Sequence, residues 1–185
     1  LLYRHHALYE CHLNTIQTMN KYHEILDKIL QDGRMQHNKK GEIKYLLNER
    51  LTLTPSDLLD IFETHGIARK KLRNELQLFM QGERQVEKYR EVGIAWWDYQ
   101  APCLSLVQFQ IDEGELVVSA YQRSSDANLG LPADIYHLYL MSRQIDLPLR
   151  SITLNLANVH IYQSNIEHTK ELLAGNDDIR FELNV

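Results

Sequence analysis

Residues 104–121 read LSLVQFQI-DEG-ELVVSAY, and this stretch decides the class of fold. Two arms rich in Val, Leu and aromatic side chains flank a short polar segment, residues 112–114, that ends in glycine. Such arms on either side of a Gly-containing turn are typical of a β-hairpin, with side chains alternating between two faces. The stretch therefore predicts an antiparallel strand pair that other elements must cover.

Helical and strand patterns surround this hairpin. Apolar residues recur at helical spacing from Tyr22 to Leu30, with Gly33 as the stop, and we expect another helix at about residues 58–64 with Ser56 as its N-cap. Further expected elements are a short strand pair in 43–54 that turns at 48–50, helices at 68–82 and 133–145, and a strand at 151–162. This order predicts an α+β fold with a mainly antiparallel sheet backed by helices.

The composition fits one globular domain. The chain has 185 residues, 44% of them hydrophobic, and its 20 basic and 25 acidic residues give a net charge of -5, which argues against a nucleic-acid binder. No apolar run approaches the roughly 18 residues of a membrane span, so we expect a soluble, cytoplasmic protein. Met19 and Asn20 resemble a fresh chain start. We therefore expect residues 1–18 to be a helical extension of a domain at 19–185.

Cys103 stands just before the hairpin and has two interpretations, a small buried hydrophobe or a thiolate nucleophile. Free cysteine is so often buried that composition alone favours the first. Arg123, however, follows the second arm, and antiparallel pairing would bring it to the start of the first arm. A cation there would lower the pKa of the thiol, and a guanidinium also binds phosphate oxygens.

Several motifs resemble the thymidylate synthase and deoxycytidylate hydroxymethylase family. They are Glu75 followed by LFMQG at 78–82, WD at 97–98, PC at 102–103, QF at 108–109, YQRSSD at 121–126, LGLPADI at 129–135 and HIY at 160–162. Their order is that of the family, and the run from Tyr121 to Ile135 is the most specific part. The resemblance implies a twisted sheet with helices on one face and a symmetric homodimer formed through the other face.

The same resemblance implies the transfer of a one-carbon unit from 5,10-methylenetetrahydrofolate to C5 of a pyrimidine nucleoside monophosphate. A thiolate that adds to C6 of the ring makes C5 a nucleophile. The implied catalytic residues are Cys103, Glu75, which orders water for proton transfers, and Arg123. The implied substrate residues are Arg123, Ser124, Lys39 and Lys40 at the phosphate, Asp134 at the ring, and His160 and Tyr162 at the sugar; Trp97, Asp126 and Gly130 would contact folate.

The ring-recognition position departs from thymidylate synthase. That enzyme has an asparagine where this chain has Asp134 in the segment PADI at 132–135. An amide both donates and accepts, which suits O4 and N3 of uracil, whereas an ionised carboxylate only accepts, which suits the N4 amino group of cytosine. Leu104, in place of a histidine common in thymidylate synthases, fits the same branch. We therefore expect dCMP hydroxymethylation, with dUMP methylation as the alternative.

Three departures keep another class of function open. Only residues 99–102 separate Asp98 from Cys103, where the family has a long segment with a catalytic tyrosine and a phosphate-binding arginine pair. The family's closing C-terminal tail is missing, and only Lys39 or Lys40 stands for its phosphate-loop arginine. Either residues are omitted here, which the surrounding motifs favour, or this is a reduced homologue that binds nucleotide or a partner without catalysis.

Two expectations concern side chains outside this constellation. His5, His6 and His12 have no cysteine or carboxylate at ligand spacing, so a solvated helix face is expected and no metal site is assigned. The enzymatic interpretation predicts that the thiol of Cys103 is more acidic than a free thiol and is protected by bound nucleotide, whereas Cys11 shows neither property.

Overall fold

The structure is a computed structural model that describes residues 20–65, 69–81, 103–176 and 181. Its sheet contains β1 (Arg34–Asn38), β2 (Gly41–Leu53), β3 (Leu104–Asp112), β4 (Glu115–Gln122), β5 (Ser125–Asp126) and β6 (Leu149–Tyr162). The strand order is β1-β2-β6-β4-β3, with β5 beside β6. Pairing is antiparallel except where β4 and β5 meet β6. The predicted α+β class with a mostly antiparallel sheet is confirmed.

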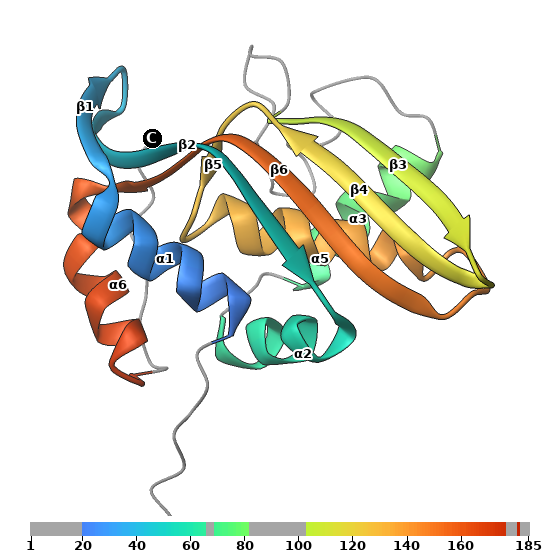
Figure 1. The fold of residues 1–185 in the computed structure, drawn as a ribbon. Coiled ribbons are helices and arrows are strands. Elements are labelled where there is room, and N and C mark those ends of the chain that lie inside the picture. The colour runs from blue at the N-terminus through green and yellow to red at the C-terminus, as the bar shows by residue number, and fades with distance from the viewer. Residues whose placement is uncertain (1–19, 66–68, 82–102, 177–180, 182–185) are drawn as a thin grey trace, which may run out of the picture.

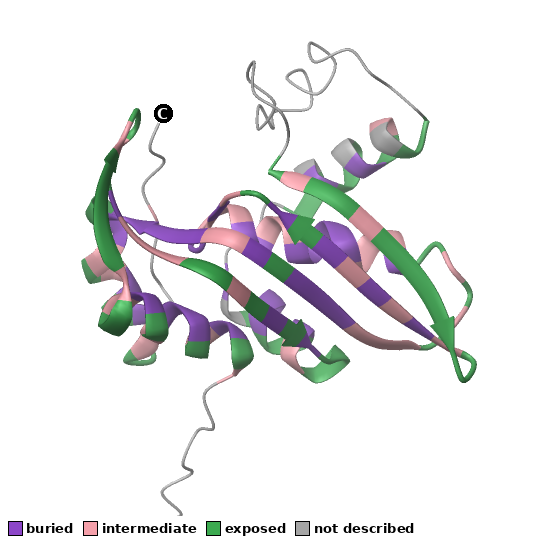
Figure 2. Cartoon of the chain, turned by 45° about the horizontal axis from the view of Figure 1, so that its top comes forward, coloured by how far each residue is buried: buried purple, intermediate pink, exposed green. Residues whose placement is uncertain are grey.

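The helices lie on one side of this twisted sheet (Figure 1). They are α1 (Lys21–Asp32), α2 (Pro55–Thr64), α3 (Arg69–Met80), α5 (Gly130–Ser142) and α6 (Ile166–Leu173), with a 3-10 turn at Gln163–Asn165. Along β4 the residues facing the helices, Leu116, Val118 and Ala120, are buried, whereas Tyr121 on the other face is 44% exposed. Figure 2 shows that other face with many exposed and half-buried positions. The core therefore sits between the sheet and its single layer of helices.

The turn expected at residues 48–50 is wrong. β2 is one strand of 13 residues, and the hairpin turns earlier, between Asn38 and Gly41, where Gly41 has a φ of 124°. The side chain of Asn38 accepts a hydrogen bond from the backbone N–H of Lys40 at 2.7 Å, which stabilises that turn. Asn48 does have a φ of 57°, but β2 pairs with β6 in the same register before and after it, so the strand continues through this residue.

Two helix predictions also need correction. The N-cap of α2 is Thr54 instead of Ser56: the Thr54 hydroxyl accepts from the backbone N–H of Asp57, and the Asp57 carboxylate accepts from the backbone N–H of Thr54. Pro55 then occupies the first helical turn, where its missing N–H costs nothing. α6 was not predicted, because its eight residues give little helical periodicity.

The hairpin, α1 with its stop at Gly33, and the strand ending at Tyr162 agree with the sequence predictions. The extension predicted for residues 1–18 and the junction before Cys103 lie outside the described residues. In the part of the chain that the structure covers, no helix combines the length and the apolar character needed to cross a membrane.

Candidate active site

The hairpin brings Cys103 and Arg123 together, as its antiparallel pairing predicts. Leu104 of β3 pairs with Gln122 of β4, so the residues just beyond them face each other at the open end of the hairpin. The backbone N–H of Arg123 donates to the carbonyl oxygen of Cys103 at 2.9 Å. Both residues are exposed. A thiol and a guanidinium thus meet at a surface that a ligand can reach.

The expectation of an acidic thiol is not met. Although Cys103 is exposed as a residue, the groups around its thiol exclude enough water to raise the pKa, and this desolvation is the largest effect. The positive charge of Arg123 opposes it, the negative charge of Asp134 adds to it, and Lys40 opposes it again. The thiol of Cys103 therefore lies among three charged side chains, and its pKa is raised above the ordinary value.

Asp134 is held against the end of the hairpin by Gln122. It lies in the first half of α5, and one of its carboxylate oxygens accepts a hydrogen bond from the side-chain amide of Gln122. Gln122 is fully buried at the end of β4, so its amide has little freedom to reorient. The sequence analysis assigned no role to Gln122; its position directly before Arg123 and on the inner face of β4 is the signal that could have revealed it.

Asp126 is a buried carboxyl beside the same cluster. Its Oδ1 accepts a hydrogen bond from the backbone N–H of Asn128 at 3.0 Å. Burial raises its pKa to about 6, although backbone N–H groups of Asn128 and Leu129 and the charge of Lys40 oppose that rise. Gly130 begins α5 directly beside it: a Cβ on Gly130 would lie 3.7 Å from that of Asp126. A carboxyl that titrates near neutral pH suits hydrogen bonding to a polar heterocycle.

His160 and Tyr162 lie together on one face of β6. Their ring centroids are 5.2 Å apart in an edge-to-face arrangement, and Asp126 of β5 stands opposite His160 in the parallel register. Burial lowers the pKa of His160 to about 4, so its imidazole is neutral at pH 7. Tyr162 forms a side-chain hydrogen bond with Asn38 from the β1–β2 turn. Its pKa is raised by burial first, then by the charge of Asp126.

The β1–β2 turn supplies the lysines. Lys39 and Lys40 are both exposed, and the charge of Lys40 acts on Cys103 and on Asp126. Ser124, half-buried, joins Arg123 to β5. The structure thus gathers residues from the hairpin end, from β5 and the start of α5, from the end of β6 and from the first turn of the sheet. These residues come from four stretches of the sequence, 39–40, 103, 123–134 and 160–162.

Two predicted site residues are not placed. Glu75 belongs to α3, but the side chain of Glu75 lies outside what the structure describes. The helix α3 packs against α5, where a ring nitrogen of His137 lies 3.0 Å from the carbonyl oxygen of Leu72. Trp97 falls in residues 82–102, which also lie outside the described part. Among the residues that are described, no group of three or more His, Cys, Asp and Glu side chains is arranged to hold a metal ion.

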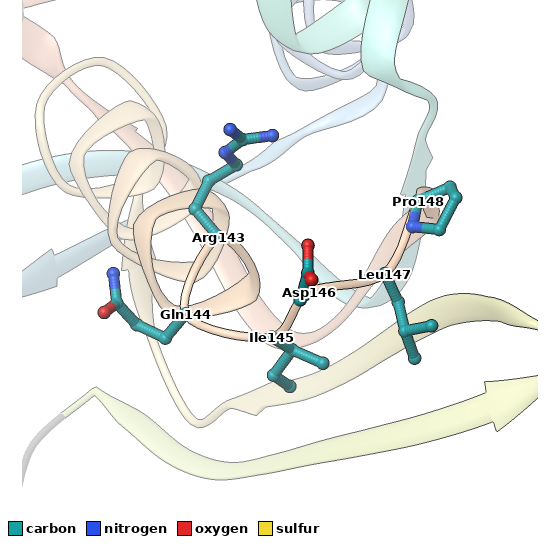
Figure 3. A pocket seen from close by; sticks show the side chains of 6 residues that line it. All are labelled: Arg143, Gln144, Ile145, Asp146, Leu147 and Pro148. Atoms are coloured by element: carbon teal, nitrogen blue, oxygen red, sulfur yellow. The ribbon is translucent and has the colours of Figure 1, made fainter.

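A hollow elsewhere on the molecule does not belong to this site. It has a volume of about 350 Å³ and is lined by the connection from α5 to β6, residues Arg143 to Pro148 (Figure 3). Asp134 lies near the opposite end of α5. The candidate site is therefore defined by its convergent polar side chains, and this hollow contributes none of them.

Comparison with known proteins agrees with this arrangement. The family model described as thymidylate synthase matches residues 99–184, which include β3 to α6. A thymidylate synthase of Listeria monocytogenes serotype 4a (strain HCC23) is 38% identical over 77 residues, which cover 40% of this chain and 24% of that protein. A thymidylate synthase of Mycoplasma pneumoniae is 38% identical over 73 residues, 37% of this chain and 25% of that protein.

The chain thus spans about a quarter of the length of the curated relatives it matches. The matched region contains the thiol, the arginine, both site carboxyls and the sugar pair. By sequence, residues 99–184 are similar to thymidylate synthases, and the fold of this part of the chain is consistent with that similarity.

Proposed function

We propose that the protein transfers a one-carbon unit from 5,10-methylenetetrahydrofolate to C5 of a pyrimidine nucleoside monophosphate, and that its reaction is the hydroxymethylation of dCMP. The observation that carries this proposal is the juxtaposition of Cys103, Arg123 and Asp134 at the end of one hairpin, where the charges of Arg123 and Asp134 both act on the thiol of Cys103. The similarity of residues 99–184 to thymidylate synthases supports the reaction class.

The choice of cytosine rests on Asp134. The amide of Gln122 donates to one oxygen of this carboxyl, and a donor at that position favours the ionised form. An ionised carboxylate accepts hydrogen bonds and donates none, so it pairs with the N4 amino group of cytosine and repels O4 of uracil. The buried Gln122 fixes the carboxyl at the mouth of the hairpin, where a ring attacked by Cys103 would lie.

The chemistry assigned to the chain begins at Cys103. Its sulfur adds to C6 of the ring, and the electron pair released toward C5 makes that carbon a nucleophile. The raised pKa means that the thiol must lose its proton against a desolvation cost, and Arg123 and Lys40 reduce that cost. The arrival of an N4 amino group beside Asp134 would lessen the negative field that this carboxylate exerts on the thiol. Substrate binding would thus favour the thiolate.

The remaining groups bind and orient. Arg123 and Ser124, with Lys39 and Lys40 from the β1–β2 turn, are assigned to the phosphate, because a guanidinium and lysines supply donors and positive charge. His160 and Tyr162 are assigned to a sugar hydroxyl. Glu75 is assigned to ordering the water used in proton transfers at the ring.

Folate supplies the one-carbon unit when it is bound. Asp126 fits the recognition of its ring system, since a buried carboxyl with a pKa of about 6 accepts hydrogen bonds when ionised and donates one when protonated. Gly130 lies beside Asp126 and leaves the approach to it uncrowded. Trp97 is assigned to packing against the same cofactor.

We also propose that two copies of the chain pair through the bare face of the sheet. Leu106 and Tyr121, which face each other across β3 and β4, are 57% and 44% exposed on that face. Small polar residues such as Ser119 and Thr153 lie next to them in register. A sheet face with this mixture of exposed apolar and small polar side chains suits a self-complementary interface.

The experiment that tests the reaction measures tritium release from C5-labelled dCMP and dUMP, each with methylenetetrahydrofolate. We expect release from dCMP to be preferred and Asp134→Asn to move the preference toward dUMP by about a hundredfold or more, because a site loses much of its discrimination when its hydrogen-bonding partner changes. Asp146→Asn, an exposed carboxylate in the α5–β6 connection, is the matched control. A strong preference of the unaltered protein for dUMP would refute the role of Asp134.

The alternative reactions make different predictions. The two relatives are thymidylate synthases by name, which favours dUMP methylation if Asp134 does not select the ring. A non-catalytic nucleotide binder is favoured by the raised pKa of Cys103. A non-catalytic binder would bind dCMP in a direct titration and would release no tritium from either nucleotide.

A further inference from the structure

One hydrogen bond at the end of β6 is not used by the proposed chemistry. The Oδ1 atom of Asn158 lies 2.9 Å from Nδ1 of His160. Side chains two residues apart along a strand point to the same face, so this contact follows directly from the strand geometry. Asn158, His160 and Tyr162 therefore form a row along one face of β6.

The contact decides which ring nitrogen carries the hydrogen. An amide oxygen is an acceptor only, so His160 can bond to it only as the donor, with its hydrogen on Nδ1. A neutral imidazole has one N–H, and the other nitrogen then holds a lone pair. Because burial keeps His160 neutral at pH 7, Nε2 is the nitrogen with the lone pair.

The surroundings of His160 hold the ring in this orientation. The residue is 6% exposed, and its ring packs edge-to-face with that of Tyr162. Its backbone is fixed from β5, since the N–H of Ala127 donates to the carbonyl oxygen of His160 at 2.7 Å. In the antiparallel register of β2 and β6, Tyr45 lies opposite His160. A ring packed in this way cannot exchange its two nitrogens without disturbing Tyr162.

We propose that Asn158 is a positioning residue that holds His160 as the Nδ1–H tautomer, so that Nε2 accepts a hydrogen bond from a sugar hydroxyl of the nucleotide. The sugar contact rests on the proposed function; the tautomer does not. The consequence for specificity is that the ligand must donate a hydrogen bond to Nε2 of His160. A free 3′-hydroxyl satisfies Nε2, whereas a methylated 3′-oxygen has no hydrogen to give and leaves a buried acceptor unpaired.

The tautomer is tested without any ligand. The ¹⁵N and ring ¹H shifts of the histidines, measured at pH 7 in the full chain and assigned with His160→Gln, report which nitrogen of His160 is protonated. We expect Nδ1–H in the unaltered protein, retention of Nδ1–H in Asn158→Asp, whose carboxylate also accepts, and loss of the fixed tautomer in Asn158→Leu. Asn155→Leu, on the exposed part of the same strand, is the matched control.

The sugar contact is tested with a pair of ligands. Calorimetric titration with dCMP and with 3′-O-methyl-dCMP should show about tenfold weaker binding of the methylated nucleotide, the loss expected for one neutral hydrogen bond. In Asn158→Leu the two affinities should become nearly equal, while Asn158→Asp and Asn155→Leu should keep the difference. A merely structural role for Asn158 would weaken both ligands alike and leave their ratio unchanged.

Each result has one meaning. A protonated Nε2 in the unaltered protein overturns the proposal, whatever the protein does with nucleotides. A fixed Nδ1–H that depends on Asn158, together with equal affinities for the two nucleotides, overturns the sugar contact. If tritium release fails but the tautomer and the affinity ratio behave as stated, the proposed reaction is wrong and the positioning role of Asn158 stands.

Discussion

At the scale of single residues, the chemistry turns on the balance of charges around Cys103. Desolvation and the carboxylate of Asp134 raise the pKa of the thiol, and the charges of Arg123 and Lys40 lower it. The balance favours the protonated thiol in the chain without ligand. The proposed selection of cytosine would account for this cost, because a carboxylate that recognises N4 would stand near a sulfur that attacks C6 of the same ring.

We expect iodoacetamide labelling of Cys103 to rise with pH, with a midpoint above the value of about 8.5 for a free thiol. Removing the negative charge in Asp134→Asn should speed labelling at pH 8 by roughly three- to tenfold, and removing the positive charge in Arg123→Gln should slow it by a similar factor. Peptide mapping separates Cys103 from Cys11. A labelling midpoint below that of a free thiol, or no response to Asp134→Asn, would contradict this balance of charges.

The sequence was sufficient to predict that Cys103 and Arg123 come together at the end of the hairpin, and insufficient to predict the side chains that hold their neighbours in place. Antiparallel pairing predicted that Arg123 approaches Cys103, and the backbone bond between them follows from that pairing. Gln122 and Asn158 are different, since each acts through a side-chain contact that depends on the exact register of a strand end. The sign of the pKa shift at Cys103 depends on desolvation, which no local motif contains.

At the scale of elements, α2 ends in a buried histidine. His65 caps the helix, and its ring packs edge-to-face on Tyr22 of α1 at 4.7 Å and stacks with Phe181 at 6.2 Å. Burial, and to a smaller extent the nearby His23 of α1, lower the pKa of His65 to about 4. The contact between α1, α2 and Phe181 therefore requires a neutral imidazole.

This histidine makes the protein sensitive to acid. The unfolded chain binds the proton near pH 6.5 and the folded chain only near pH 4, so the stability that depends on a neutral His65 is present above pH 6.5 and is lost as the pH falls toward 4. The loss amounts to roughly 3 kcal/mol. His160, whose pKa is also about 4, contributes a loss in the same range of pH.

Urea unfolding between pH 7.5 and pH 4.5 checks this. His65→Phe keeps a ring between Tyr22 and Phe181 and cannot be protonated, so it should remove the contribution of His65 to the acid-induced loss, about 2 to 3 kcal/mol over this range. The raised pKa of Asp126 acts in the opposite direction in both proteins and leaves this difference unchanged. His37→Phe, which replaces an exposed histidine of β1, should leave the loss in place. An undiminished pH dependence in His65→Phe would show that other groups carry the acid sensitivity.

The prediction of helices and strands succeeded where a periodic pattern extends over many residues. It failed where one or two local hydrogen bonds or a single backbone angle set the boundary of an element. The hairpin of β3 and β4 and the helix α1 contain long patterns that only one structure satisfies. The start of α2 depends on the reciprocal hydrogen bonds between Thr54 and Asp57. The position of the first hairpin turn depends on Gly41, whose positive φ is accessible to glycine at little cost.

At the scale of the whole molecule, the described helices lie on one side of the sheet, and no other described residues cover its opposite face (Figures 1 and 2). The hydroxyls of Thr52 and Thr153 bond to each other across β2 and β6 at 3.1 Å, so part of the polar character of this face is satisfied within the sheet. Leu106 and Tyr121 remain as its exposed apolar side chains. Apolar groups between internally satisfied polar ones suit contact with a second copy.

We expect the chain to sediment as a dimer at tens of micromolar and Tyr121→Glu to shift it to the monomer, because two like charges would meet near the symmetry axis of a self-complementary interface. Ile111→Glu is the matched control: this residue of β3 is 65% exposed but pairs with Leu116, whose side chain lies on the face that the helices cover. It should leave the dimer intact. Sedimentation velocity distinguishes the outcomes, and a monomeric unaltered chain, or equal dissociation by both substitutions, would exclude the bare face as the interface.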